Sequence, residues 1–473
     1  MFVSDMSRGK SILLINPHLP VGSPWGLSKM LPPLGLMYIA AVLEKHGFDV
    51  KIFDNYLFNK PVNHIKLLVR EFRPRIVGIS CNSVTYRNCL EIAEAVKEVS
   101  PETWVIVGGP HPTYMPETLL RYDAVDVVVV GEGELAMAEL AKRLTRGDNT
   151  DLAEVPGVAY KCGDKIVENP PKFIEDLDIL PFPSRHLIPL HNYDRRMNFL
   201  DVEPVDTMNV VRGCPFNCRF CETKKIWGSK PRHFSPQRVV EEIEFLIAEY
   251  GSKGVYFVGD NFTINKKWTM SLCNLINKHK IDLDWVCDTR VDLVSRDLLE
   301  VMKRAGCKTI WFGVESGSPR VLEKLNKGIS LQQVVHAFKL CRVVGIKVAC
   351  SFMLGIPGES IEDMYATLKF AMKLNPDWCR FNIFVACPGS ALYDEVLEKG
   401  LYDRKDDFLL YVKTGDFDYD LLTEIQKFFH RTFHRAPARI IKKLVEGMKS
   451  PYNWKHFFSR LPRGFKAFLG NGD

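Results

Sequence analysis

The sequence lacks any run of about twenty apolar residues, so it predicts no membrane-spanning helix. Its first residues, "MFVSDMSRGKSILLINP", contain no basic segment followed by a long apolar core, and we therefore expect no secretory signal. The resulting expectation is a cytoplasmic, reducing location. In such a setting the thirteen cysteines are expected to be thiols and metal ligands rather than disulfides.

A strong excess of either charge is also missing, because the net charge of the whole chain is only +6. That excess lies at the C-terminal end, where residues 421–473 hold eleven Lys and Arg against three Asp and Glu. The rest of the chain is therefore close to neutral, which argues against a broad basic face for nucleic acid. No nucleic-acid partner is expected.

The length of 473 residues exceeds that of one ordinary core, so two or three domains are expected. Residues 11–150 alternate short apolar runs, such as "SILLINP" and "VDVVVVGEGE", with amphipathic segments, such as "YRNCLEIAEAVKEVS". This pattern predicts an α/β fold, with a doubly wound, Rossmann-like domain over residues 1–150. In such a domain ligands bind beyond the carboxyl ends of the strands.

Several of those predicted strand ends are rich in glycine. The candidate ligand-binding residues there are Ser80, Gly108, Gly109, Pro110, His111, Gly131, Glu132 and Gly133. Glycine lets the backbone approach a ligand closely, so these loops could form a cradle for a large molecule. They could equally be tight turns between strand and helix, and the loops alone do not decide between the two.

The rest of the chain divides into three parts. Residues 151–204 are proline-rich ("LPFPSRHLIP") and predict a linker with a possible hairpin at "GVAYKCGDKIVENP". Residues 205–391 contain six strand-then-helix units without reversal, which predicts a partial (β/α)6 barrel whose chemistry lies on the loops after the strands. Residues 392–473 are expected to form a helical, basic C-terminal region.

Three cysteines cluster at the end of the first barrel strand, in "CPFNCRFC". Cys214, Cys218 and Cys221 follow a C-x3-C-x2-C spacing, which fits a metal or an iron–sulfur cluster. A structural zinc ion needs a fourth ligand, for which His233 is the one nearby candidate. Three thiolates on the active face of a barrel favour a cluster with one iron left open for another ligand.

This motif resembles that of the radical S-adenosylmethionine superfamily, in which an aromatic residue, here Phe220, precedes the last cysteine. The segments "VYFVGDN", "WFGVESGSPRVLEKLNKG" and "SFMLGIPGES" resemble further motifs of that family in the same order. The resemblance implies a [4Fe-4S] cluster on the three cysteines and cleavage of S-adenosylmethionine to a 5′-deoxyadenosyl radical. It implies that S-adenosylmethionine is contacted by Phe220, Asp260, Asn261, Arg290, Glu315, Ser316, Gly355 and Pro357.

Three of these residues also have simpler structural interpretations. Glu315 could pair with Arg290 or Lys347 at the barrel mouth, and Asp260 could cap the helix that follows its loop. Arg290 could clamp the carboxylate of methionine or serve only as a structural partner.

The N-terminal segments "LPPLGLMYIAAVLEKHGFDVKIFD", "GGPHPTYMPE" and "GEGE" resemble the cobalamin-binding domain of class B radical S-adenosylmethionine enzymes. The resemblance implies that the eight strand-end residues named above contact cobalamin. Many cobalamin domains supply a cobalt-ligating histidine from a D-x-H-x-x-G motif, but "NPHLPVG" has Asn16 and Val21 at the motif's Asp and Gly positions. We therefore expect that His18 does not ligate cobalt.

The pair of domains implies methylation of an unactivated carbon in a small-molecule or lipid substrate, with electrons from a flavodoxin or ferredoxin. The same pair occurs in oxidative cyclases and rearrangement enzymes, such as the anaerobic magnesium-protoporphyrin monomethyl ester cyclase, so this alternative stays open. A methylthiotransferase is more remote, because it would need three further cluster cysteines and a C-terminal β-barrel. A zinc-stabilised nucleic-acid-binding protein would hold zinc and no chromophore.

The C-terminal segment interleaves aromatic and basic side chains. The aromatic residues are Phe428, Phe429, Phe433, Trp454, Phe457, Phe458, Phe465 and Phe468. Such a segment could dock on anionic lipid, or it could pack its aromatic face on its own protein. Peripheral membrane contact by the tail is therefore one of two hypotheses, and packing of the tail on its own protein is the other.

Overall fold

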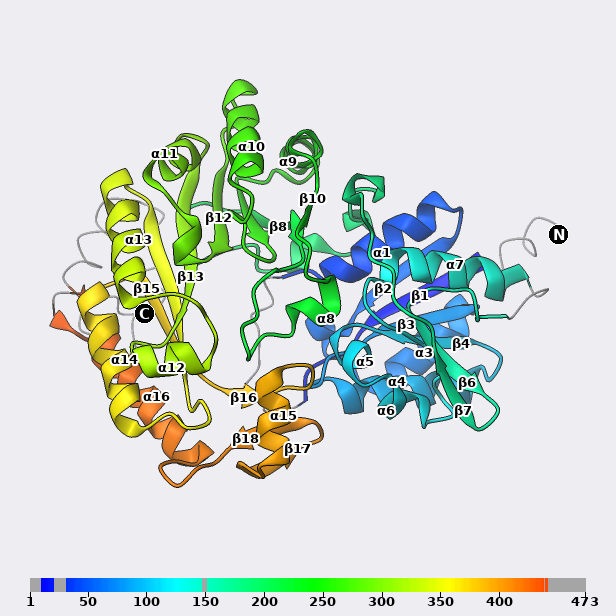
Figure 1. Cartoon of the computed structure of the whole chain (residues 1–473). Coiled ribbons are helices and arrows are strands. Elements are labelled where there is room, and N and C mark those ends of the chain that lie inside the picture. The colour runs from blue at the N-terminus through cyan, green and yellow to red at the C-terminus, as the bar shows by residue number, and fades with distance from the viewer. Residues whose placement is uncertain (1–9, 21–30, 147–150, 438, 441–473) are drawn as a thin grey trace, which may run out of the picture.

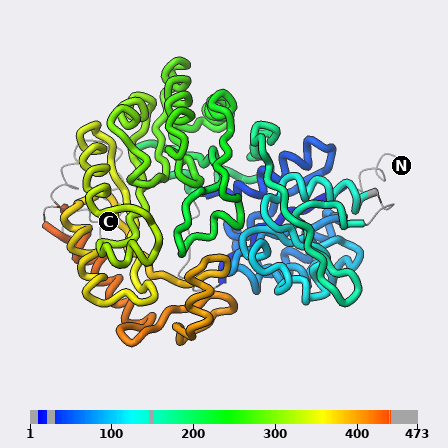
Figure 2. Tube along the Cα trace, viewed as in Figure 1, coloured from blue at the N-terminus to red at the C-terminus, as the bar shows by residue number. Residues whose placement is uncertain are grey.

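The computed structural model describes residues 10–20, 31–146, 151–437 and 439–440. Within these residues no helix is both long enough and apolar enough to cross a membrane. The chain forms two bodies in contact, an N-terminal one and a central one, and a C-terminal segment that touches both (Figure 2).

The N-terminal body is the predicted doubly wound domain. Its parallel strands are β1 (Ser11–Asn16), β2 (Asp49–Asp54), β3 (Ile76–Ser80), β4 (Trp104–Gly108) and β5 (Val127–Val129), in the order β2-β1-β3-β4-β5. Helices α1 (Leu34–Lys45) and α7 (Gly133–Arg146) cover one face of this sheet, and α3 (Val62–Phe72) and α4 (Tyr86–Val99) cover the other (Figure 1). Short helices α2 (Asn55–Phe58), α5 (Pro110–Tyr114) and α6 (Pro116–Leu120) occupy connections.

The sheet continues beyond residue 150. The predicted hairpin is formed by β6 (Val158–Cys162) and β7 (Lys165–Glu168), and β6 pairs antiparallel with β5. The remaining linker residues run between the two bodies with only short 3-10 turns. The first half of the proline-rich segment is thus part of the first domain's sheet.

The central body is the predicted partial barrel. Its six parallel strands are β8 (Val205–Asn209), β11 (Gly254–Val258), β12 (Asp284–Thr289), β13 (Cys307–Glu315), β14 (Lys347–Leu354) and β15 (Trp378–Ile383). They pair in chain order along an open arc from β8 to β15 (Figure 1). The helices on the outside are α9 (Pro236–Tyr250), α10 (Lys266–Lys278), α11 (Arg296–Arg304), α12 (Pro319–Lys324), α13 (Leu331–Val344) and α14 (Ile361–Leu374).

Polar N-caps begin several of these helices. Ser235 accepts a hydrogen bond from Arg238 N at the start of α9, and Ser330 and Gln333 form a capping box at the start of α13. These side chains satisfy backbone N–H groups that lack partners within the helix. The starts of these helices therefore have a local physical cause in the sequence.

The C-terminal region differs from the helical expectation. A three-stranded antiparallel sheet is formed by β16 (Val385–Ala386), β17 (Tyr402–Asp406) and β18 (Leu409–Val412), with α15 (Ala391–Glu398) between β16 and β17. The charged run "YDRKD" of β17 carries no alternating apolar pattern, so a strand could not be predicted there. At the tip of this sheet, Phe408 packs against Tyr86 and His111 of the first domain, with ring centroids 4.9 and 4.6 Å apart.

Helix α16 (Tyr419–His434) closes the free edge of the barrel sheet. Gln426 Nε2 donates to Phe381 O at 2.8 Å, and His434 lies 3.2 Å from Cys379 O. Phe429 and Phe433 are fully buried against Phe381. The helix thus satisfies carbonyl groups of edge strand β15 and packs its aromatic face on its own protein. The other predicted tail aromatics, apart from exposed Phe428, lie outside the described residues.

Candidate active site

The cysteine loop begins after β9 (Val211–Arg212), which pairs antiparallel with β10 (Arg232–His233). Gly213 has φ +97°, and a Cβ placed on it would lie 2.4 Å from Lys230 O. Its N–H donates to Asp260 Oδ2 at 3.0 Å. Only glycine fits this position, and Asp260 fixes the start of the loop to the loop after β11.

The three thiols line one cavity of about 210 Å³ at the carboxyl ends of the barrel strands. Of the eight residues expected to contact S-adenosylmethionine, four line the same cavity: Phe220, Asp260, Asn261 and Arg290. The chain therefore brings three separate sequence motifs together around one space.

Polar groups converge on the sulfur atoms. Asn261 Nδ2 lies 3.4 Å from Cys214 Sγ, Arg290 Nη1 lies 3.8 Å from Cys218 Sγ, and Cys221 Sγ lies 3.3 Å from Thr223 Oγ1. Burial raises the pKa of Cys214 and Cys218, while the charges of Arg290 and Lys327 lower that of Cys218. These donors stabilise thiolate charge in a partly buried site, as cluster ligation requires.

Arg290 is held rigidly beside the cysteine loop. Its guanidinium pairs with Asp292 at 2.9 and 3.0 Å, donates to Lys327 O at 2.7 Å, and lies 3.7 Å from the centre of the Phe216 ring. The expected partnership of Arg290 with Glu315 is not formed, because Glu315 accepts from Lys327 Nζ at 3.0 Å.

The other four expected S-adenosylmethionine contacts do not line the cavity. Glu315 ends β13 with φ +69°. Its Oε1 lies so close to the cavity residue Gly313 that a Cβ added to this glycine would be only 2.4 Å from it. Ser316 is fully buried and lies 3.1 Å from Thr367 Oγ1. Gly355 is pressed against Leu422 of α16, where an added Cβ would come within 2.5 Å, and Pro357 is buried beside it.

Sequence reasoning missed several cavity residues. They are Phe216, Thr223, Gly259, Asp288, Thr289, Trp311, Gly313, Lys327 and Ser351. Asp288, Trp311 and Ser351 lie within strands, and a polar residue inside an otherwise apolar strand was the available signal. Asp288 accepts a hydrogen bond from Tyr256, and burial raises its pKa to about 7.

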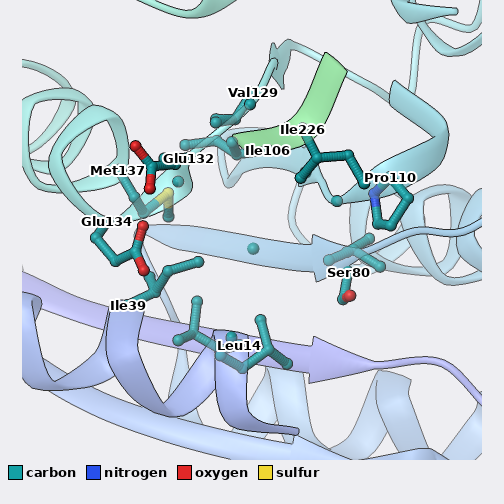
Figure 3. A pocket seen from close by; sticks show the side chains of 18 of the residues that line it. Leu14, Ile39, Ser80, Ile106, Pro110, Val129, Glu132, Glu134, Met137 and Ile226 are labelled. Atoms are coloured by element: carbon teal, nitrogen blue, oxygen red, sulfur yellow. The ribbon is translucent and has the colours of Figure 1, made fainter. Parts of the chain in front are cut away.

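A second cavity, of about 320 Å³, lies at the carboxyl ends of β1, β3, β4 and β5 in the N-terminal domain. Figure 3 shows apolar side chains around it, with Glu132 and Glu134 near Met137 and with Ser80 near Pro110 and Ile226. Seven of the eight expected cobalamin contacts line it: Ser80, Gly108, Gly109, Pro110, Gly131, Glu132 and Gly133.

His111 is the eighth expected contact and does not line this cavity. Its side chain is fully buried, lies 3.1 Å from Ser83 Oγ and 3.0 Å from Thr118 Oγ1, and packs against Phe408. Burial lowers its pKa to about 4. His18 does not line the cavity either, and its Nδ1 lies 3.3 Å from Asn55 Nδ2.

Helix α8 (Thr223–Trp227) connects the two cavities. It begins two residues after Cys221, where Thr223 lines the first cavity, and its last residues Ile226 and Trp227 line the second. In Figure 1 it lies between the barrel and the first domain. The cysteine cavity and the glycine-lined cavity are therefore bordered by the two ends of one short helix.

A buried ion-pair network joins the domains beside α8. Arg212 donates to Glu132 at 2.9 Å and to Glu134 at 2.6 Å, and Arg232 donates to the other Glu132 oxygen at 2.7 Å. Ile174 N also donates to Glu132 at 2.7 Å. The two carboxylates of the "GEGE" segment thus form ion pairs with arginines that precede and follow the cysteine loop in the sequence.

The residues fit the groups that the motifs imply. Within the described part of the chain, no three His, Cys, Asp or Glu side chains are grouped to hold a single metal ion. The three thiols instead surround a cavity, which suits a cluster of several atoms, and His233 does not line it. The second cavity combines apolar walls with glycine backbone, which suits the aromatic tail of a large cofactor.

Comparisons with known proteins agree with this geometry. The sequence model of the Radical SAM superfamily matches residues 208–371, and that of the B12 binding domain matches residues 28–141. An uncharacterized methyltransferase of Pyrococcus horikoshii is 34% identical over 426 residues, covering 88% of this chain and 90% of that protein. The chain belongs to the radical SAM superfamily.

Two further relatives of this radical SAM protein are named for different activities. The cytidylyl-2-hydroxyethylphosphonate methyltransferase of Streptomyces wedmorensis is 29% identical, covering 92% of both chains. The anaerobic magnesium-protoporphyrin IX monomethyl ester cyclase of Rubrivivax gelatinosus is 28% identical, covering 88% of this chain and 73% of that protein.

Solved structures share the fold of this radical SAM protein. The cobalamin-dependent S-adenosylmethionine radical enzyme OxsB with aqua-cobalamin bound has a TM-score of 0.75 at 18% identity, covering 95% of this chain and 72% of OxsB. The methyltransferase TsrM of Kitasatospora setae, with cobalamin and a [4Fe-4S] cluster bound, has a TM-score of 0.69 at 19% identity. The match covers 84% of this chain and 79% of TsrM. The predicted pair of domains is confirmed, and the cofactors of the chain are a [4Fe-4S] cluster, S-adenosylmethionine and cobalamin.

Proposed function

We propose that the chain transfers a methyl group to an unactivated carbon of a small-molecule or lipid substrate. The observation that carries this proposal is that helix α8 borders both the cysteine cavity and the glycine-lined cavity. Radical formation and methyl supply can then act on a substrate held between them. The Pyrococcus and Streptomyces relatives, both named methyltransferases, support the proposal.

When bound, the cluster supplies the electron that cleaves S-adenosylmethionine to a 5′-deoxyadenosyl radical, and cobalamin supplies the methyl group. The chain's own residues bind and orient. Asn261 and Arg290 stabilise negative charge on Cys214 and Cys218, while Thr223 links Cys221 to Asp260 at 3.3 and 3.2 Å. These contacts fix the position of the cysteine loop relative to the strand ends.

The electron donor is expected to be an acidic protein of the flavodoxin or ferredoxin type. Cys221 is the one exposed thiol of the three, and Lys225 and Lys230 are exposed near it in the sequence. A surface of this charge suits an acidic partner. All thirteen cysteines lie within the described residues and none forms a disulfide, as a reducing setting favours. Lipid contact by the tail remains a prediction.

A radical cyclase is the second candidate, and the similarity to the Rubrivivax cyclase favours it. A putative methylthiotransferase of Methanocaldococcus jannaschii is also 30% identical, covering 80% of this chain and 79% of that protein. In the first domain, however, Cys81 and Cys89 are fully buried while Cys162 is exposed on the hairpin, so these thiols offer no second cluster site.

Product analysis distinguishes the candidates. The protein is purified anaerobically, reconstituted with iron, sulfide and cobalamin, reduced, and incubated with S-adenosylmethionine and a cell extract as substrate source. A methylase yields both 5′-deoxyadenosine and S-adenosylhomocysteine. Formation of 5′-deoxyadenosine alone would favour a cyclase or rearrangement, and formation of neither product would refute the proposal.

A further inference from the structure

Three polar side chains gather on the inner face of the last two barrel strands. Arg380 of β15 is aligned with Ser351 of β14, which is aligned with Gly313 of β13, and the last two line the cysteine cavity. Because side chains alternate along a strand, Arg380 and Asn382 share the face of Ser351. The intervening Phe381 is fully buried on the opposite face, under α16.

These three side chains have no hydrogen-bond or ion-pair partner within the described part of the chain. Arg380 and Asn382 are exposed, and neither they nor Ser351 make a hydrogen bond or ion pair with a described residue. The guanidinium carbon of Arg380 lies 5.3 Å from the centre of the Trp311 ring, which also lines the cavity. Arg380 itself does not line that cavity, but stacking places its guanidinium beside a side chain that does and leaves its N–H groups free.

The other charged side chains of the cysteine cavity already have partners: Asp260 accepts hydrogen bonds from Gly213 N and Thr223 Oγ1. Arg290 is paired with Asp292, and Lys327 is paired with Glu315. Asp288 is bonded to Tyr256, and burial raises its pKa to about 7, so this carboxyl carries little negative charge below neutral pH. Arg380 therefore brings a cation to the inner face of the barrel that no acidic side chain of the described chain pairs with.

We propose that Arg380, Ser351 and Asn382 bind an anionic oxygen group, a carboxylate or a phosphate, of the substrate. A guanidinium offers parallel N–H donors that match such a group, and the hydroxyl and amide add two more donors beside it. The inference rests on the proposed function, because it assigns a substrate class to the same site: a small acid rather than a neutral lipid. The carboxylate of S-adenosylmethionine is the second possible source of the anion.

The test is equilibrium dialysis of the reconstituted protein with labelled inorganic phosphate, with and without saturating S-adenosylmethionine. Wild type is expected to bind phosphate in both conditions, and R380M is expected to bind it at least tenfold more weakly. R380K keeps the charge but loses the planar fork, so an intermediate affinity is expected. R404M is the matched control, because Arg404 is an exposed arginine 4.4 Å from the Tyr411 ring, on β17 outside the barrel.

A second measurement distinguishes an anionic group of the substrate from the carboxylate of S-adenosylmethionine. In R380M the loss of affinity for phosphate is expected to exceed any loss of affinity for S-adenosylmethionine at least fivefold. Phosphate binding by R380M equal to that of wild type would overturn the inference. So would displacement of phosphate by S-adenosylmethionine together with a tenfold loss of its affinity in R380M. Failure of the proposed function would appear separately, as wild type that forms no 5′-deoxyadenosine or forms it without S-adenosylhomocysteine.

Discussion

Glu132 of the N-terminal domain and Arg212, two residues before Cys214, form an ion pair at 2.9 Å with both side chains almost completely buried. Arg212 also lies 4.6 Å from the Trp227 ring, at the end of the helix that borders both cavities. The position of the cobalamin domain relative to the cysteine loop is therefore fixed by a carboxylate and a guanidinium with no access to solvent.

Glu132→Gln tests the strength of this link. The substitution keeps the shape of the side chain but leaves Arg212 and Arg232 without their shared negative partner, which is expected to cost about 3 kcal/mol of unfolding free energy. Guanidinium unfolding of the reconstituted protein measures the loss. Glu175→Gln is the control, because its exposed pair with Lys230 should contribute nothing measurable. Equal stability of the two variants would contradict the role of Glu132.

Gly213→Ala tests the geometry of the cysteine loop. The new methyl group would lie 2.4 Å from Lys230 O at φ +97°, so the loop must shift away from Asp260. Iron content after reconstitution is expected to fall roughly tenfold while cobalamin binding persists. Gly251→Ala is matched, since its φ is +62° with open space around it, and should cost only about 1 kcal/mol with iron retained. Full iron content in Gly213→Ala would contradict this reading.

Gly108→Leu tests the assignment of the second cavity. A Cβ on Gly108 would make only ordinary contact with Val129, at 3.5 Å, but the rest of a leucine side chain would occupy the cavity. Cobalamin affinity, measured by absorbance of the bound cofactor, is expected to fall at least tenfold. Iron content should stay unchanged and serves as the internal control. Undiminished cobalamin affinity would place the cofactor elsewhere.

Asp288→Asn tests the electrostatics of the barrel interior. Burial raises the folded pKa of Asp288 to about 7, above its unfolded value near 4, so the wild type loses stability as pH rises between these values. Asparagine cannot ionise and still accepts from Tyr256. The variant is expected to be more stable than wild type at pH 8 by about 4 kcal/mol, with little difference at pH 4. Parallel pH–stability curves for the two proteins would contradict the shifted pKa.

The sequence predicted the parts of the site that depend on local pattern. Glycines after apolar runs indicated the loops at Gly108 and Gly131, and the cysteine spacing indicated the cluster site, because both signals lie within a few residues. It could not predict that Trp227 would border the cavity of the first domain, since that contact depends on how two domains dock. For the same reason the sequence indicates Glu132 as a cofactor contact but could not predict that its carboxylate binds Arg212 and Arg232.

Metal analysis of the anaerobically reconstituted protein tests the central claim most directly. Wild type is expected to contain about four iron atoms, four sulfides and one cobalt per chain. Cys218→Ala is expected to lose the iron and sulfide and to retain the cobalt, because its thiol lines only the first cavity. A single zinc without sulfide in the wild type, or an intact cluster in Cys218→Ala, would contradict the assignment of this chain as a cobalamin-dependent radical S-adenosylmethionine enzyme.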